Sequence, residues 1–104
     1  MLEGHADFVA APELRLRVDE AVNRGARKLV LDFTRSTSVD STAGGILVGA
    51  LKRLRPRGGC VVVVCPDPDI REVFHFAGLE SMFPITETLV DALAALDESG
   101  PGRQ

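Results

Sequence analysis

Apolar residues are arranged along the chain in two alternating patterns, a helical spacing and a short continuous run. Residues 12–24 have the helical spacing, with Pro12 suited to the first helical position and Gly25 to a left-handed stop. The apolar stripe of this segment consists of Leu14, Val18, Ala21 and Val22. Residues 28–33, KLVLDF, are apolar on both faces, and residues 60–65, CVVVVC, are a continuous apolar run. Both are typical of strands in a sheet that is covered on both sides.

Two further helices are indicated between and after these strands. The segment from about Ser41 to Leu54 predicts a helix that the sequence RPRGG ends. Asp67 is placed to cap a third helix, which begins at Pro68 and stops at Gly78.

The end of the chain predicts one more strand and one more helix. Residues 82–85, MFPI, indicate a short last strand. Residues 87–96 indicate an amphipathic helix, with Thr88 and Asp91 spaced as in a capping box. At the start of the chain, residues 2–8 have the pattern of the end of an additional strand.

The alternation of helices and strands predicts a single α/β domain. A mostly parallel sheet of about four strands with four helices is expected from this order. The 104 residues suit one domain over residues 1–97, followed by a frayed tail over residues 98–104.

Composition narrows the function classes. The net charge of −3 gives the surface no general attraction for nucleic acid or anionic lipid. No apolar run approaches the roughly 18 residues of a membrane span, and the first residues lack the pattern of a signal peptide. We therefore expect a cytoplasmic protein. Cys60 and Cys65 fall on opposite faces of one strand, so they cannot pair with each other.

The stretch VDSTAGG, residues 39–45, concentrates polar and flexible residues where a helix should begin. It follows a strand, at the sheet edge where α/β proteins place functional groups. Asp40 or Ser41 could cap the helix, and a cap alone is one interpretation of the stretch. Gly44 and Gly45 indicate more than a cap, because a glycine in a helix costs about 1 kcal/mol of stability relative to alanine. They are expected where something approaches the backbone closely.

Two other features of the same helix have both a structural and a binding interpretation. Gly45 and Gly49 lie four residues apart, and the favoured interpretation is a helix packed closely on the sheet rather than a groove for a partner. The basic end, which consists of Lys52, Arg53, Arg55 and Arg57, complements the negative pole of the helix. An acidic partner surface could also use it.

Catalytic and metal chemistry find little support. A serine nucleophile at Ser41 would need a base, and the only histidines are His5 and His75. The glycines are followed by bulky apolar residues rather than by a phosphate-loop lysine. Asp32 and Asp40 have no neighbouring His or Cys for a metal site. We expect no catalytic residues, no metal and no cofactor.

Taken together, these segments resemble a STAS domain of the bacterial anti-sigma factor antagonist group. In that family an LVLDL-like strand leads to D-S-[ST]-G-[LI]-G, a helix with a basic end, a valine-rich strand and a GLxxxFPI segment. The matching stretches are LVLDF, VDSTAGG, LKRLRPRGG, CVVVVCPDPDIREVFHFAGLESMFPI and LVDALAAL. The early segment GHADFVAAPEL also resembles a turn of the family, and the match runs from Gly4 to about Leu96.

The resemblance implies a STAS-type β–α superhelix whose first N-terminal strand or strands are missing from this chain. A sheet without them would present an unpaired edge. We expect this edge to pair with a second copy or with another protein.

The resemblance also implies a non-enzymatic phosphoprotein of a partner-switching pathway that regulates transcription, as in stress responses or sporulation. Its partners would be an anti-sigma factor with a histidine-kinase-like ATPase fold, which phosphorylates Ser41, and a serine phosphatase. No direct contact with nucleic acid or membrane is expected. The implied partner-binding residues are Asp7, Asp40, Ser41, Thr42, Ala43 and Gly44.

Three alternatives remain open. The same fold serves as an unphosphorylated subunit of lipid-transport or signalling assemblies. A receiver-like domain would carry an acyl phosphate on Asp32, but the residues after the valine strand lack the lysine that such a domain needs. A small-molecule enzyme is the third alternative, with no catalytic set to name.

Overall fold

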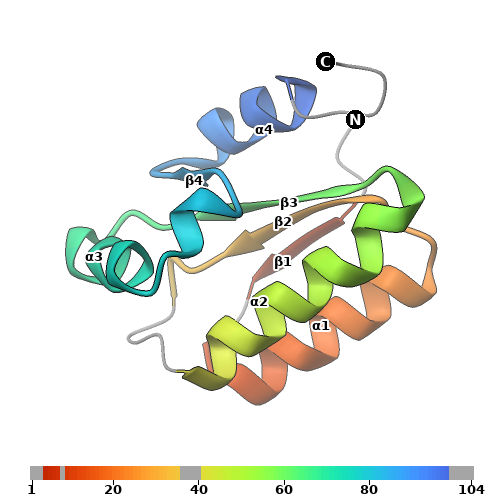
Figure 1. Ribbon diagram of the computed structural model, residues 1–104, viewed down its shortest axis with the longest axis horizontal. Coiled ribbons are helices and arrows are strands. Elements are labelled where there is room, and N and C mark those ends of the chain that lie inside the picture. The colour runs from red at the N-terminus through yellow and green to blue at the C-terminus, as the bar shows by residue number, and fades with distance from the viewer. Residues whose placement is uncertain (1–3, 8, 36–40, 99–104) are drawn as a thin grey trace.

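The continuous apolar runs pair side by side as a parallel sheet at the centre of the molecule (Figure 1). This computed structural model describes residues 4–7, 9–35 and 41–98. The strands lie in the order β1-β2-β3-β4, and all three pairings are parallel. Their bounds are Gly4–Asp7 for β1, Lys28–Asp32 for β2, Cys60–Val64 for β3 and Ile85–Thr86 for β4.

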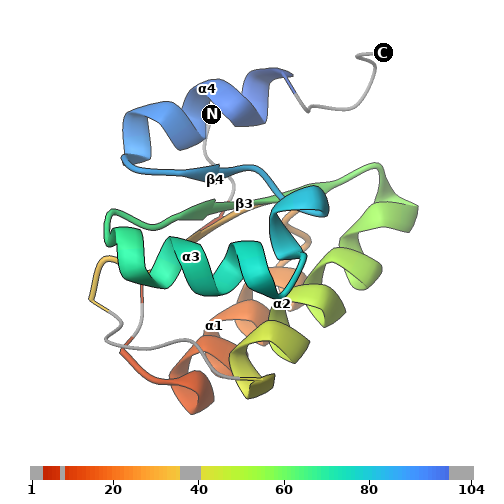
Figure 2. The same ribbon diagram turned by 60° about the vertical axis from the view of Figure 1, so that its left-hand side comes forward.

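Helices cover both faces of this sheet, as Figures 1 and 2 show. Helices α1 (Ala11–Asn23), α2 (Ser41–Leu54) and α3 (Pro68–Phe76) share one hydrophobic cluster with one face. Helix α4 (Leu89–Glu98) packs on the other face through a smaller cluster. Two 3₁₀ turns, η1 (Arg55–Arg57) and η2 (Leu79–Ser81), follow α2 and α3. The predicted α/β fold with four strands and four helices is confirmed.

The apolar stripes fall where the sequence predicts them. All four stripe residues of α1 are buried, whereas Leu16 is 52% exposed. The rings of Phe33, just after β2, and Phe74 of α3 meet edge to face at 5.2 Å, which ties the end of β2 to α3. Cys65 belongs to the main cluster and Cys60 packs against the smaller one on the other face, so the two do not pair with each other. No helix among the described residues is long and apolar enough to cross a membrane.

The predicted helix ends are confirmed by their local chemistry. The Asp67 carboxylate accepts the Asp69 N–H at 2.9 Å, and the Thr88 hydroxyl accepts the Asp91 N–H at 3.1 Å. Gly25 and Gly78, which follow α1 and α3, have φ of 88° and 74°, a conformation that favours glycine.

The prediction of a strand over residues 82–85 is wrong for most of that stretch. The N–H groups of Met82 and Phe83 donate to the Leu79 carbonyl, so these residues close the turn after α3. Pro84 has no N–H to give to a sheet. The Phe83 side chain is buried in the core from this turn, which explains the apolar pattern, and the strand itself is Ile85–Thr86.

The turn between η1 and β3 holds Gly59, a position without room for a side chain. A Cβ at Gly59 would lie 2.1 Å from the Arg27 carbonyl oxygen and 3.1 Å from that of Leu54. The backbone approaches so closely because Gly59 donates to the Leu54 carbonyl while Cys60 donates to that of Arg27. Gly59 thus sets the register at which β3 begins beside β2.

We expect Gly59→Ala to lower the free energy of unfolding by about 1–3 kcal/mol, because backbone atoms must move to admit the methyl group. Gly45→Ala is the matched control. Its added Cβ meets no atom within 4 Å, so it should stabilise α2 by up to about 1 kcal/mol. Urea unfolding followed by circular dichroism measures both. Equal stability of wild type and Gly59→Ala would contradict the close approach.

Candidate functional site

Ser41 is the first described residue of α2, beyond the carboxyl end of β2. Its side chain is exposed, and so is that of Thr42. The N-terminus of a helix carries unpaired N–H groups and the positive end of the helix dipole, which favour negative charge. Asp40 lies outside the described residues, so the predicted cap at this position stays a prediction.

The residues of α2 that follow Thr42 pack this helix on the sheet. Ala43 is only 4% exposed and belongs to the main core, as do Leu47 and Ala50. Gly44 is half-buried. Of the predicted partner-binding residues on α2, Ala43 therefore serves the core, whereas Ser41 and Thr42 remain accessible.

Ser41 lies at one end of an apolar hollow between α2 and the end of α3. The hollow has a volume of about 660 Å³. Helix α2 contributes Ser41, Gly44, Gly45, Val48, Gly49 and Lys52. The other wall is formed by Val73, Ala77 and Leu79. Ser41 and Gly44 are thus brought together in one feature of the surface.

The glycines of α2 face this hollow and not the sheet. A Cβ at Gly45 or Gly49 would meet no atom within 4 Å, and one at Gly44 would make an ordinary contact of 3.7 Å with Leu79. The favoured interpretation of Gly45 and Gly49, a helix packed closely on the sheet, is therefore wrong. Their missing side chains open the surface beside Ser41.

The basic side chains at the end of α2 have two different surroundings. Arg53 pairs with Asp19 of α1 at 2.7 Å, and Arg57 donates to the Val22 carbonyl at 3.2 Å. These contacts join the end of α2 to α1. Lys52 lines the hollow instead, and among the described residues it makes no ion pair. Lys52 is the basic side chain that the hollow presents.

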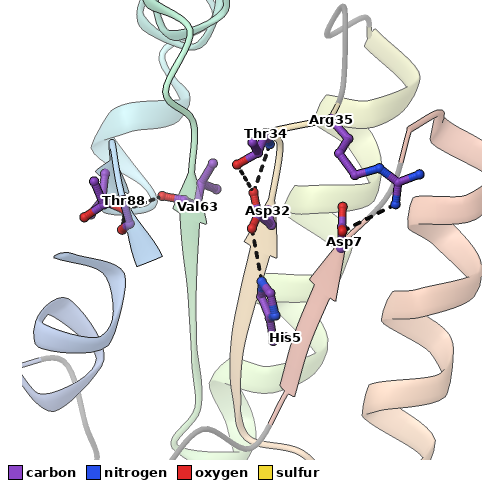
Figure 3. A network of polar contacts seen from close by, with 8 residues as sticks. His5, Asp7, Asp32, Thr34, Arg35, Val63 and Thr88 are labelled. Atoms are coloured by element: carbon purple, nitrogen blue, oxygen red, sulfur yellow. Dashed lines mark hydrogen bonds and ion pairs between the residues drawn. The ribbon is translucent and has the colours of Figure 1, made fainter. Parts of the chain in front are cut away.

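A separate polar network lies at the carboxyl ends of β1 and β2 (Figure 3). Asp32 accepts hydrogen bonds from the Thr34 N–H and hydroxyl, and its other oxygen lies 3.1 Å from His5 Nε2. Asp7 pairs with Arg35 at 3.4 Å. On the far side of β3, Thr86 Oγ1 donates to the Val63 carbonyl at 3.0 Å, which joins β4 to β3.

This network faces the other side of the sheet from the hollow. Asp7 is paired in register with Asp32, two residues after Val30, which belongs to the cluster under α4. Residues paired across parallel strands share a face. Asp7 therefore does not join Ser41 and Gly44, the two predicted partner-binding residues that line the hollow.

Three of the described groups have shifted pKa values, and one of them is the Cys65 thiol, whose pKa is raised by burial. Partial burial raises the pKa of Asp32, but hydrogen bonds from Thr34 and the nearby His5 outweigh it, so the pKa lies below its ordinary value. The Glu80 carboxylate, in hydrogen-bond contact with the exposed His75, raises the pKa of that histidine. His75 is thus a surface residue that links α3 to η2.

These contacts bear on the chemical alternatives. The Asp32 carboxylate, which a receiver-like domain would phosphorylate, is engaged by Thr34 and His5. Within the described ranges, no group of three acidic, His or Cys side chains could hold a metal ion.

Sequence reasoning missed the wall of the hollow and the His5–Asp32 pair. The wall comes from α3 and the turn after it, far along the chain from Ser41. Val73 and Phe76 gave a signal, because both are large apolar residues off the buried stripe of α3. His5 and Asp32 come together only through the register of β1 on β2.

Comparison with known proteins shows a family match over most of the chain. The model of the STAS domain matches residues 1–92. BtrV of Bordetella bronchiseptica, which carries the provisional name of an anti-sigma factor antagonist, is 30% identical over 100 residues, covering 96% of this chain and 86% of BtrV.

Solved structures give the same picture. An anti-sigma factor antagonist from Mycobacterium paratuberculosis is 32% identical, with a TM-score of 0.74 over 91% of this chain and 80% of that protein. The Bacillus cell fate determinant SpoIIAA in its phosphorylated form is 27% identical, with a TM-score of 0.59 over 91% of this chain and 86% of SpoIIAA.

We expect Asp32→Asn to lower the free energy of unfolding at pH 7 by about 1 kcal/mol, because an ionised acceptor bonds more strongly than an amide. The pKa of Asp32 in the folded protein is below 3.8, its unfolded value. The wild-type advantage is therefore complete well above that value and disappears as the pH falls through the folded pKa. Urea unfolding at a series of pH values measures it.

Asp7→Asn is the control, because the ion pair of Asp7 with Arg35 is exposed and should contribute less. A stability difference between wild type and Asp32→Asn that is the same at pH 7 and pH 3 would contradict this account.

Proposed function

The chain belongs to the STAS domain family, and we propose that it is an anti-sigma factor antagonist controlled by phosphorylation of Ser41. The unphosphorylated protein binds an anti-sigma factor that is also a serine kinase and thereby releases a sigma factor. Phosphorylation ends this binding, and a serine phosphatase restores it. The protein acts by binding in the cytoplasm and catalyses no reaction itself.

The observation that carries this proposal is the position of Ser41. Its side chain is exposed at the start of a 14-residue helix and borders an apolar hollow. A kinase can reach an exposed hydroxyl of this kind. The similarity to SpoIIAA, which has been solved in a phosphorylated form, and to other anti-sigma factor antagonists supports the same assignment.

The physical effect of a phosphate here falls on the partner and not on the fold. A phosphate adds a charge of about −1.5 to −2 and three acceptor oxygens. The helix N-terminus accommodates that charge, so the domain stays folded. A partner that covers the hollow would have to remove water from the phosphate, which is costly beside apolar side chains.

The outer edge of β1 is a second proposed contact. β1 stands at one end of the strand order, and no strand among the described residues pairs with its outer edge. We expect this edge to pair with a second copy or with another protein. Light scattering over a range of concentrations tests self-pairing, and a monomer at every concentration would contradict it.

The Ser41 switch is tested with the cognate anti-sigma factor kinase and ATP, comparing wild type, Ser41→Ala and Ser41→Asp. We expect wild type and Ser41→Ala to bind and only wild type to gain a phosphate. Ser41→Asp should bind at least tenfold more weakly, a loss of about 1.4 kcal/mol or more. Calorimetry measures the affinity and mass spectrometry the phosphate.

Val90→Asp is the matched control, because it adds a negative charge at an exposed position of α4, on the other face of the sheet, and should bind like wild type. If all variants bind alike and none is phosphorylated, the residues at Ser41 only begin a helix. The protein would then be better described as an unphosphorylated STAS subunit of a lipid-transport or signalling assembly.

A further inference from the structure

We propose that the hollow beside Ser41 receives an amphipathic helix of the anti-sigma factor, with its apolar side in the hollow and a carboxylate at Lys52. This inference rests on the proposed function, whose binding surface it identifies. The hollow is lined by Gly44, Gly45, Val48 and Gly49 of α2, opposite Val73 and Leu79.

The glycines are the first argument for an occupant. Each costs the helix about 1 kcal/mol relative to alanine. Nothing in the isolated domain requires this cost, because a Cβ at Gly45 or Gly49 would meet no atom within 4 Å and one at Gly44 would fit in ordinary contact. What the glycines provide is space beside α2, which opens toward α3 in this hollow and, at Gly45 and Gly49, also toward α1 in a smaller one. A partner that fills the larger hollow would make use of this space.

The extent of the apolar surface indicates a protein and not a small molecule. Val73 in the wall of the hollow is 42% exposed, and Phe76, three residues further along α3, is 79% exposed. Residues three apart are neighbours on a helix surface, so the apolar area continues past the hollow. A small ligand enclosed by the hollow would leave Phe76 in water, whereas a helix lying along it would cover both.

Charge sets the direction of the occupant. Ser41 and Lys52 line opposite ends of the hollow, and eleven residues of α-helix at 1.5 Å each separate them by about 16 Å. This length suits about three turns of a partner helix, with apolar side chains at helical spacing facing the glycines. Since Lys52 has no ion pair among the described residues, a partner carboxylate at that end is the complementary group.

The same geometry explains how one phosphate can control the whole surface. Ser41 borders the hollow, so its phosphate stands where the end of the partner helix enters. Negative charge there opposes the removal of water from the hollow that binding requires. Phosphorylation and occupation of the hollow are therefore mutually exclusive.

The test measures binding to the cognate anti-sigma factor by calorimetry, with unphosphorylated full-length protein. Gly49→Leu fills the hollow and Val73→Asp places a charge in it, and we expect each to weaken binding at least tenfold. Val90→Asp is the control, because Val90 is 76% exposed but lies on α4, on the other face of the sheet. Lys52→Glu should weaken binding most at low salt, since salt screens an exposed ion pair.

Urea unfolding checks that the variants are folded, and Gly49→Leu should be at least as stable as wild type. Hydrogen exchange in the wild-type complex should show protection over residues 41–52 and 73–79. Ser41→Asp is measured alongside as the reference for the switch.

The outcomes separate the two proposals. If Ser41→Asp loses binding but Gly49→Leu and Val73→Asp bind like wild type, no partner helix occupies the hollow and this inference is overturned. The proposed control by Ser41 is then retained. If wild type does not bind the anti-sigma factor at all, both are overturned. If wild type alone is a dimer that Gly49→Leu dissociates, the hollow takes a second copy, which also overturns the inference.

Discussion

The structure depends on the burial of β2 and β3 between two helical layers. Val30 and Val62 face α4, while Leu29 and Val61 face α1 and α2, and all four are almost fully buried. Parallel strands of this kind are stable only when both faces are covered. Each strand must therefore be followed by a helix that returns across the sheet, and α2 is the helix that returns from β2. The place where α2 starts, with Ser41, is thus a consequence of the core.

One side of helix α2 packs in the core, and another lines the hollow that we propose as the partner-binding surface. Ala43, Leu47 and Ala50 hold one side on the sheet, and Arg53 joins its end to α1. The side that lines the hollow has few side chains, because Gly45 and Gly49 contribute none. A helix with alanine at these positions would be more stable, and the difference is typical of surfaces that function has shaped. The stability lost on one side is offset by the apolar contacts of the other.

The sequence predicted most of the fold because its local signals agree with the tertiary structure. Proline and glycine mark the ends of α1 and α3, and the stripe of α1 is the buried stripe. The prediction of a strand over residues 82–85 failed because Phe83 lies in a turn and is nevertheless buried in the core. An apolar pattern shows burial, but it does not distinguish a turn from a strand. The prediction that Gly45 and Gly49 let α2 pack closely on the sheet failed for a related reason. A missing side chain allows close packing and also an open surface, and only the position of α3 decides between them.

The candidate site was predicted in part for the same physical reason. Ser41 is visible in the sequence because its neighbours form a local pattern, whereas the wall that Val73 and Leu79 provide is assembled by the packing of α3 beside α2. This arrangement places Ser41, the proposed phosphorylation site, outside the core and next to the proposed contact surface. Because Ser41 is exposed and lies outside the core, we expect the proposed phosphorylation to change affinity with little change in stability. The proposed switch would need no second conformation, since a phosphate on Ser41 would itself occupy the space beside the hollow that a partner requires.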